Sequence, residues 1–320
     1  MNNTVYICPE TKTQLFLSEC GTFLTCKNGV INYPVIENIP RFVDKDNYAS
    51  AFGFQWKHFH STQLDSTSGL SISEDRLARV LGFPLKKLKG LHVLEAGSGS
   101  GRFTEILLKY GAILDTFDFS VACEANKTNH PSANIAQADI RKMPYRDSYY
   151  DVVICIGVLQ HTPSPEQSIE CLFEKVKPGG LLAVDHYRFK LRNVLPPPVG
   201  IGRNLYRPIV IRLRPTIRWK AVENLVKFWF PVHWFFRKSK LALRILRRVS
   251  PLHFYYHELP LKSRDQHYEW SLLDTHDGLT DYHKHYRSVK QLTSLLKKLG
   301  ANDVIGYISP SDGVEVRAIK

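Results

Sequence analysis

The sequence lacks any uncharged apolar run of about 18 residues, the length that a membrane-spanning helix needs. Its first ten residues, MNNTVYICPE, contain no apolar run of signal-peptide length. The most apolar stretch, 226–236, is interrupted by Lys227, Pro231 and His233 and is too short to cross a bilayer. We therefore expect no transmembrane segment and a cytoplasmic protein.

Cysteine is also sparse, and its spacing does not indicate a disulfide framework. Cys123, Cys155 and Cys171 lie in apolar or helical contexts and are predicted to be buried thiols. The other three, Cys8, Cys20 and Cys26, fall in the opening segment.

Acidic residues are nearly absent from one segment, and this absence explains the net charge of +13. Residues 188–248 contain 16 lysines and arginines but one acidic residue, Glu223, whereas the rest of the chain carries a net charge of −2. Such a concentration of positive charge is typical of a surface that faces an anionic partner.

Strands and helices are predicted to alternate from residue 91 onwards. Apolar strand patterns at 91–97, 113–119, 134–139, 150–157 and 181–187 are separated by helical patterns at 102–111, 121–130 and 165–180, the last closed by a Pro-Gly-Gly turn. After the basic segment, a helix at 288–300 and two strands joined by a turn at 311–313 complete the pattern. This alternation predicts an α/β fold with a doubly wound, mostly parallel sheet.

The same patterns divide the chain into four parts. Residues 1–45 form a small β-rich unit with hairpin signals, and a short helix capped by Ser73 precedes the alternating part. We expect a core at 46–190, a basic helical insertion at 191–286 and a return to the core at 287–320.

A glycine-rich loop, VLEAGSGSG, places Gly97, Gly99 and Gly101 between the first strand and first helix of the sheet. Open α/β sheets bind ligands at this edge, and glycine lets a ligand approach the backbone closely. The third glycine comes one residue too early for the dinucleotide fingerprint, and Arg102 stands in its place. Glu95 would repel a pyrophosphate but could receive an ammonium group, which favours a cofactor with an amino-acid end over NAD.

These residues resemble the class I S-adenosylmethionine-dependent methyltransferases over about 91–190 and the C-terminal helix and strands. The resemblance implies a seven-stranded Rossmann-like sheet with a reversed last strand. It also implies that the glycine loop wraps the methionine part of S-adenosylmethionine, that the FDFS sequence meets the ribose and adenine, and that QADI meets the adenine. The implied cofactor residues are Glu95, Gly97, Ser98, Gly99, Gly101, Asp118, Phe119, Asp139, Ile140 and, in the loop after the fourth strand, Gly157.

The opening segment resembles the zinc-ribbon-like unit that precedes some methyltransferase cores. Zinc ribbons hold the metal with two close pairs of ligands. Here Thr11 and Gly29 stand where the partners of Cys8 and Cys26 would be, and Cys20 is out of register. We expect a degenerate unit without a metal site.

The basic insertion has three interpretations. It is a solvated lid, a contact with an anionic membrane surface, or an RNA-binding surface. The stretch 228–249 mixes tryptophan and phenylalanine with lysine and arginine and contains an amphipathic helical pattern, which favours peripheral membrane binding. No RNA-binding module is recognisable, which makes RNA the weaker alternative.

Two histidines are candidates for a general base in methyl transfer, His161 after the fourth strand and His186 after the fifth. The stretch 277–285 could close over the acceptor. No Asn-Pro-Pro-Tyr-type sequence follows the fourth strand, and Cys155 lies inside that strand, which disfavours methylation of nucleic-acid amino groups or base carbons.

The sequence thus predicts an S-adenosylmethionine-dependent methyltransferase. Its acceptor would be an oxygen or nitrogen of a small or lipid-linked molecule, such as a glycan precursor. The alternatives are an RNA methyltransferase and a catalytically silent cofactor-binding scaffold.

Overall fold

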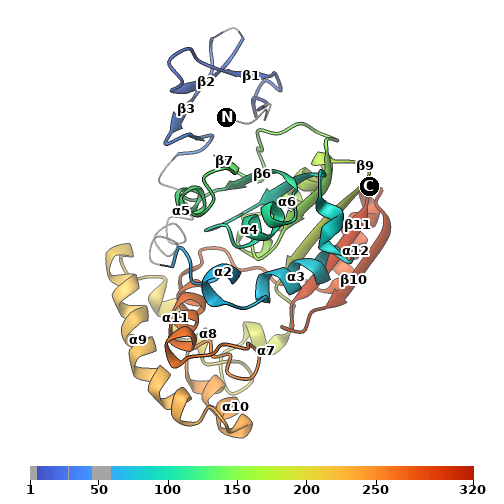
Figure 1. Ribbon diagram of the computed structural model, residues 1–320. Helices are drawn as coiled ribbons and strands as arrows, with labels where there is room; N and C mark the ends of the chain where they lie inside the picture. Colours follow the sequence, from blue (N-terminus) through green and yellow to red (C-terminus); the bar gives the residue numbers. More distant parts are fainter. Residues whose placement is uncertain (1–5, 28, 45–58) are drawn as a thin grey trace.

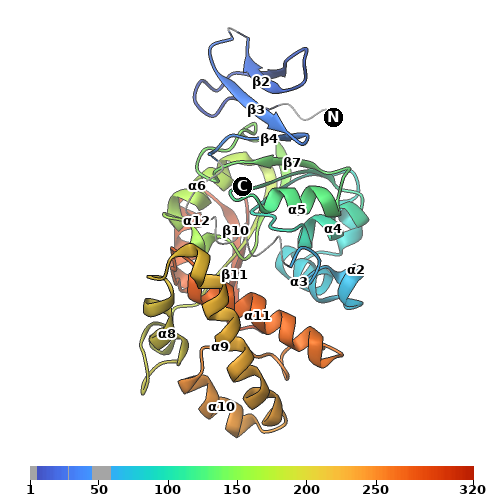
Figure 2. The same cartoon turned by 90° about the vertical axis from the view of Figure 1, so that its left-hand side faces the viewer.

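The computed structural model describes residues 6–27, 29–44 and 59–320, and they form three stacked parts (Figure 1). A small N-terminal sheet lies at one end, a large sheet with helices on both faces lies in the middle, and helices α8 to α10 lie at the other end. Figure 2 shows the same order from the side.

The central sheet has seven strands in the order β10-β11-β9-β8-β5-β6-β7. The neighbouring strands from β9 through β8, β5 and β6 to β7 are parallel. In contrast, β11 runs antiparallel to both β9 and β10. The predicted Rossmann-like sheet with a reversed last strand is therefore confirmed. The strands are β5 (His92–Ala96), β6 (Ile113–Asp118), β7 (Asn134–Gln137), β8 (Tyr150–Cys155), β9 (Val176–His186), β10 (Asn302–Ile308) and β11 (Val314–Ile319).

Two apolar clusters attach helices to the opposite faces of this sheet. On one face, α6 and α12 pack against the sheet through buried residues that include Ile169 and Leu292. On the other face, α3 and α4 pack against the sheet through buried residues that include Leu77 and Ile106. The core helices are α2 (Asp65–Ser68), α3 (Ile72–Leu81), η1 (Leu85–Leu88), α4 (Arg102–Lys109), α5 (Ala122–Asn129), η2 (Leu159–His161), α6 (Pro165–Lys175) and α12 (Val289–Lys298).

Two local predictions are wrong. The Pro-Gly-Gly sequence does not end a helix, because β9 starts at Val176 and passes through it, with Gly179 at a φ of +77°. Val176 pairs with Tyr150, and this pairing to β8 fixes the segment as strand. The helix α3 starts after Ser71 rather than at Ser73, whose amide instead donates to the Asp65 carboxylate.

The N-terminal unit is a four-stranded antiparallel sheet that packs against the β7 edge of the core. Arg41 joins the two parts, because its guanidinium donates to the Gln137 side chain at 3.1 Å and pairs with Glu124 at 3.1 Å. The strands are β1 (Leu15–Leu17), β2 (Phe23–Cys26), β3 (Asn32–Ile36) and β4 (Ile39–Pro40).

The segment between β9 and α12 is helical and has its own apolar cluster, which includes Val222, Phe230 and Leu273. Its helix α11 packs against α8 and α9 and begins with a capping box at Ser263. Its helices are α7 (Leu191–Val194), α8 (Arg203–Val210), α9 (Pro215–Phe235), α10 (Lys240–Val249) and α11 (Arg264–Thr280). In the described part of the chain, no helix has the length and apolar character needed to span a membrane.

Candidate active site

The glycine loop occupies the turn from β5 into α4. Gly97, Gly99 and Gly101 have φ angles of +76°, +54° and +96°, a region that favours glycine. A Cβ atom at Gly97 would lie 2.3 Å from Val158 Cγ2, and one at Gly101 would lie 2.3 Å from Asn126 Oδ1. The loop sequence is therefore fixed both by backbone conformation and by close neighbours.

Asp118 ends β6 and organises this loop. Its Oδ2 accepts a hydrogen bond from the Gly99 amide at 2.8 Å, and its Oδ1 accepts from the Ser120 amide at 2.8 Å and the Ser120 hydroxyl at 2.7 Å. Burial raises the pKa of Asp118. A carboxylate offers about four acceptor positions, so this arrangement leaves one position on Oδ2 for a ligand among the described residues.

Asp139 and Ile140 follow β7 at the same edge of the sheet. The Asp139 carboxylate pairs with Arg141, whose Nη2 lies 2.6 Å from Oδ2, and it also accepts from the Arg141 amide at 2.8 Å. Ile140 is buried and packs in the same apolar cluster as Phe117. The acid predicted to meet an adenine amino group thus already has a cationic partner.

Glu95 lies beneath the loop rather than on a cavity wall. Its Oε2 accepts from the Thr104 hydroxyl at 2.6 Å and the Thr116 hydroxyl at 3.1 Å, and its side chain is buried. Burial raises the pKa of Glu95 to about 7. Its Oε1 has no hydrogen-bond partner among the described residues, which leaves one buried acceptor available.

His186 follows β9 and is almost completely buried. Its Nδ1 lies 3.1 Å from the Tyr187 carbonyl oxygen. Because a carbonyl only accepts, Nδ1 carries the proton of the neutral ring and Nε2 carries the lone pair. Burial lowers the pKa of His186 to about 4, and Nε2 has no hydrogen-bond partner in the described part of the chain. This ring is a neutral acceptor near pH 7.

His161, in η2, has a different environment. Its Nδ1 lies 3.4 Å from Asp281 Oδ2, and its Nε2 lies 3.8 Å from Asp277 Oδ1. Burial favours the neutral ring, but the two carboxylates outweigh it and raise the pKa of His161. The stretch predicted to close over the acceptor therefore supplies the acids that face this histidine.

One cavity of about 1550 Å³ connects these residues and extends from the glycine loop into the helical insertion. Glu95 and Gly101 are outside its lining. The predicted site residues that line it are Gly97, Ser98, Gly99, Asp118, Phe119, Asp139, Ile140, Gly157, His161 and His186.

The polar atoms of this cavity fit a ligand that has both donors and acceptors. The hydroxyls of Ser98 and Ser100 and the Nε2 of His186 are buried without hydrogen-bond partners among the residues described. Gly157 has a φ of +80°, and a Cβ there would have no atom within 4 Å, so the cavity wall is open at that point. Such a surface suits a nucleoside joined to an amino acid.

Sequence reasoning missed several residues of the same cavity. Asp185, on β9, accepts from the Gly157 amide at 2.6 Å and pairs with Arg76 of α3. Asp274 reaches the cavity from α11, beside Asp277 of the stretch predicted to close over the acceptor. The position of Asp185 at a strand end could have identified it, whereas no sequence signal placed Arg76 or Asp274 at this edge.

The N-terminal cysteines do not line this cavity. Cys8 is buried and accepts a hydrogen bond from the Thr11 amide, with 3.4 Å between N and Sγ. The Thr11 hydroxyl also contacts Cys26 Sγ at 3.7 Å. Within the described ranges, no group of three or more potential ligands could hold a metal ion.

Comparison with known proteins identifies the core. A family model described as a methyltransferase domain matches residues 94–184. The ubiquinone biosynthesis O-methyltransferase of Coxiella burnetii is 34% identical over 100 residues, which cover 30% of this chain and 43% of that protein. The corresponding enzyme of a Shewanella species is 32% identical over 102 residues, which cover 29% and 42%. The match thus spans less than half the length of these relatives.

Solved structures resemble the chain at low sequence identity. Magnesium protoporphyrin IX methyltransferase from Synechocystis, solved with S-adenosylhomocysteine, is 14% identical with a TM-score of 0.45, over 85% of this chain and 96% of that one. A methyltransferase from Aquifex aeolicus is 14% identical with a TM-score of 0.42, over 78% and 89%.

The family match covers the glycine loop, Asp118, Asp139 and the strand β8 with Gly157 in the loop that follows it. Residues 94–184 therefore match the methyltransferase-domain family, and the sheet that contains them has the class I S-adenosylmethionine-dependent methyltransferase fold.

Proposed function

We propose that this protein transfers the methyl group of S-adenosylmethionine to an oxygen or nitrogen atom of a small or lipid-linked acceptor. The observation that carries this proposal is the shared cavity, which the family's cofactor motifs and two histidines line together. In the proposal, 46–190 with 287–320 holds the cofactor, and 191–286 supplies the acceptor site. The segment 1–45 has no assigned task.

The geometry of the strand ends supports the proposed set of cofactor residues. The glycine loop would face the methionine part, with Glu95 near its ammonium group, and the free position on Asp118 would accept from a ribose hydroxyl. Phe119, Asp139 and Ile140 would surround the adenine. When bound, the cofactor supplies an electrophilic methyl group, so orientation of the acceptor contributes much of the catalysis.

A general base is needed where the acceptor atom must lose a proton. His186 is the better candidate, because its Nε2 lone pair is unpartnered in the described residues and its ring is neutral. His161 is held between two carboxylates and is suited to keeping a proton. The names of the relatives, which are O-methyltransferases, favour oxygen over nitrogen as the acceptor atom.

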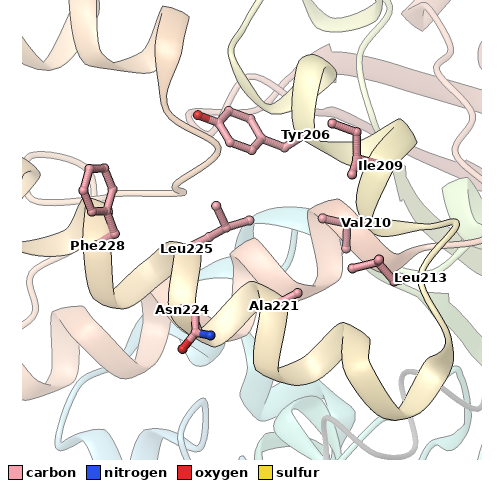
Figure 3. A pocket seen from close by; sticks show the side chains of 8 residues that line it. All are labelled: Tyr206, Ile209, Val210, Leu213, Ala221, Asn224, Leu225 and Phe228. Atoms are coloured by element: carbon pink, nitrogen blue, oxygen red, sulfur yellow. The ribbon is translucent and has the colours of Figure 1, made fainter.

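A peripheral membrane contact is part of the proposal, because the insertion exposes an unusual amount of apolar surface. More than half of the exposed large hydrophobic side chains in the described residues lie between 189 and 249, among them Ile209 and Phe228. Figure 3 shows these two at the rim of an apolar hollow of about 370 Å³ between α8 and α9. Apolar surface beside many cations is typical of proteins that bind anionic membranes.

Transfer of label tests the reaction. The protein is incubated with methyl-tritiated S-adenosylmethionine and, separately, with the lipid extract, the small-molecule extract and the RNA of its source cells. We expect label in one of the first two, and we expect His186→Ala to slow transfer by roughly 10²–10⁴-fold with unchanged cofactor affinity. Label only in RNA would favour the RNA alternative, and cofactor binding without any transfer would favour the silent scaffold.

Flotation with liposomes tests the membrane contact. We expect flotation to require anionic lipid and to weaken as salt is added, because ions screen the attraction. Flotation that is indifferent to lipid charge, or no flotation at low salt, would contradict it.

A further inference from the structure

Helix α10 has an unusual orientation for a helix at a protein surface. A surface helix normally turns its apolar face inward and its charged face to water. In α10 no residue is buried, and Leu241, Ile245 and Val249 are 66%, 58% and 47% exposed. Leu243 packs against the apolar cluster of the insertion, and the cationic face of α10, with Lys240, Arg244, Arg247 and Arg248, borders the cavity.

The charge on this face is largely uncompensated. Arg247 pairs with Glu258 at 3.3 Å, but no carboxylate among the described residues forms an ion pair with Lys240, Arg244 or Arg248. Lys240, Arg244 and Arg248 are exposed at the border of the cavity, so an anionic ligand there would reach them without displacing a carboxylate of the described residues.

A second group of cations lines the same cavity. Arg188, Lys190 and Arg192 all pair with one carboxylate, that of Asp312, at 2.9, 2.6 and 3.1 Å. Three cations share a single anion, so this group also carries excess positive charge. The cavity is thus acidic near α11 and strongly basic towards α10 and the β9–α7 connection.

The size of the cavity permits two ligands. Pockets for a single ligand of drug size measure roughly 300–1,000 Å³. The volume of about 1550 Å³ exceeds that range. The glycine loop and α10 both line this one cavity. A second molecule can therefore occupy the basic part while the cofactor occupies the glycine-loop part.

We propose that the cationic face of α10 is an anion subsite, and that the methyl acceptor carries a phosphate or pyrophosphate group that binds there. This inference rests on the proposed function, and it specifies the class of acceptor. Arginine is well suited to the role, because its guanidinium donates two parallel hydrogen bonds to phosphate oxygens. The phosphate belongs either to a soluble molecule or to a lipid headgroup, and the exposed apolar face of α10 would lie against the lipid in the second case.

Titration of the full chain with inorganic pyrophosphate tests the subsite, with S-adenosylhomocysteine present. We expect saturable binding that Arg244→Gln with Arg248→Gln weakens by at least about tenfold, the effect of losing a charge-assisted hydrogen bond. The matched control is Arg212→Gln with Lys220→Gln. It removes the same charge from exposed positions of the insertion that do not line the cavity. We expect it to change the affinity by less than about twofold at fixed ionic strength.

Absence of saturable binding, or an equal loss in both double variants, would overturn the proposal. Affinity for S-adenosylhomocysteine is measured on the same samples and should be unchanged in both. If S-adenosylhomocysteine does not bind but pyrophosphate does, the proposed function fails and the anion site remains. If S-adenosylhomocysteine binds but pyrophosphate does not, the subsite fails and the proposed function remains.

Vesicles distinguish the two sources of phosphate. Phosphatidylcholine vesicles with and without phosphatidate are mixed with the wild type and the Arg244→Gln, Arg248→Gln variant. A lipid headgroup in the subsite predicts binding that needs phosphatidate, that the variant loses and that pyrophosphate reverses. A soluble phosphate predicts that vesicle binding is the same in both proteins, while the difference in pyrophosphate affinity persists.

Discussion

Replacement of Asp118 by alanine tests the proposed cofactor site at the residue that orders the glycine loop. Three hydrogen bonds from the protein occupy its carboxylate, and one acceptor position is left on Oδ2. A ligand hydroxyl at that position would make one hydrogen bond to a charged acceptor, which is worth about 1.5–3 kcal/mol. We therefore expect Asp118→Ala to bind S-adenosylhomocysteine roughly 13- to 160-fold more weakly.

The arrangement of acceptors sharpens this prediction. If both ribose hydroxyls bound Asp118, the second would have to displace a protein donor, either the Gly99 amide on Oδ2 or a Ser120 group on Oδ1. Two such hydrogen bonds at about 1.5 kcal/mol each would make the loss of affinity in Asp118→Ala roughly 160-fold. Ser120→Ala separates the two effects, because it removes one hydroxyl donor and leaves the carboxylate in place. We expect Ser120→Ala to weaken binding less than Asp118→Ala.

The assay is calorimetric titration of protein whose folding has been verified by circular dichroism. Asp115→Asn is the control, since Asp115 lies on the same strand, accepts from the Tyr150 hydroxyl at 2.7 Å and does not line the cavity. It should lower the melting temperature while changing affinity by less than about twofold. Wild-type affinity in folded Asp118→Ala, or an equal loss in Asp115→Asn, would refute the reasoning.

Three further predictions follow from other contacts. Gly97→Ala should lower the free energy of unfolding in urea by about 1–3 kcal/mol, and adding Val158→Ala should recover part of it, because the new Cβ would lie 2.3 Å from Val158 Cγ2; equal stability would contradict the geometry. The wild type should bind S-adenosylhomocysteine about tenfold more tightly at pH 8 than at pH 6, since the pKa of Glu95 is raised to about 7 and only its ionised form attracts an ammonium group. Glu95→Gln should abolish this difference, and a difference that persists would assign it to another group. Asp281→Asn should cost about 3–5 kcal/mol of stability by removing the buried carboxylate that pairs with the partly buried Arg207 and Lys284. Burial would raise the pKa of Asp281, but Lys284 and His161 hold it low, so the wild type should keep this contribution at neutral pH and lose it only as the pH falls below the ordinary range of a carboxylate.

The parts of the fold that were predictable are those that local pattern determines. Alternating apolar segments predicted the parallel sheet. Because open α/β sheets bind ligands at the carboxyl ends of their strands, the sequence also predicted that the loop at Gly97, Asp118 and Asp139 would share one edge. The helix pattern failed at Gly179, because pairing of β9 with β8 overrides the local turn signal.

The rest of the site depends on contacts between distant segments. Asp277 and Asp281 face His161 across more than 110 residues of sequence, and only the packing of α11 brings them there. The amphipathic pattern of 240–249 was visible in the sequence, but periodicity does not reveal which face of a helix points towards the protein. The orientation of α10, and with it the cationic wall of the cavity, therefore required the three-dimensional structure.

The central claim is that the cavity beside the glycine loop binds S-adenosylmethionine. Calorimetric titration of the purified protein with S-adenosylhomocysteine, and with NAD as the control, tests it most directly. The account predicts saturable binding of S-adenosylhomocysteine and none of NAD. Folded protein that binds NAD, or that binds neither compound, would contradict it.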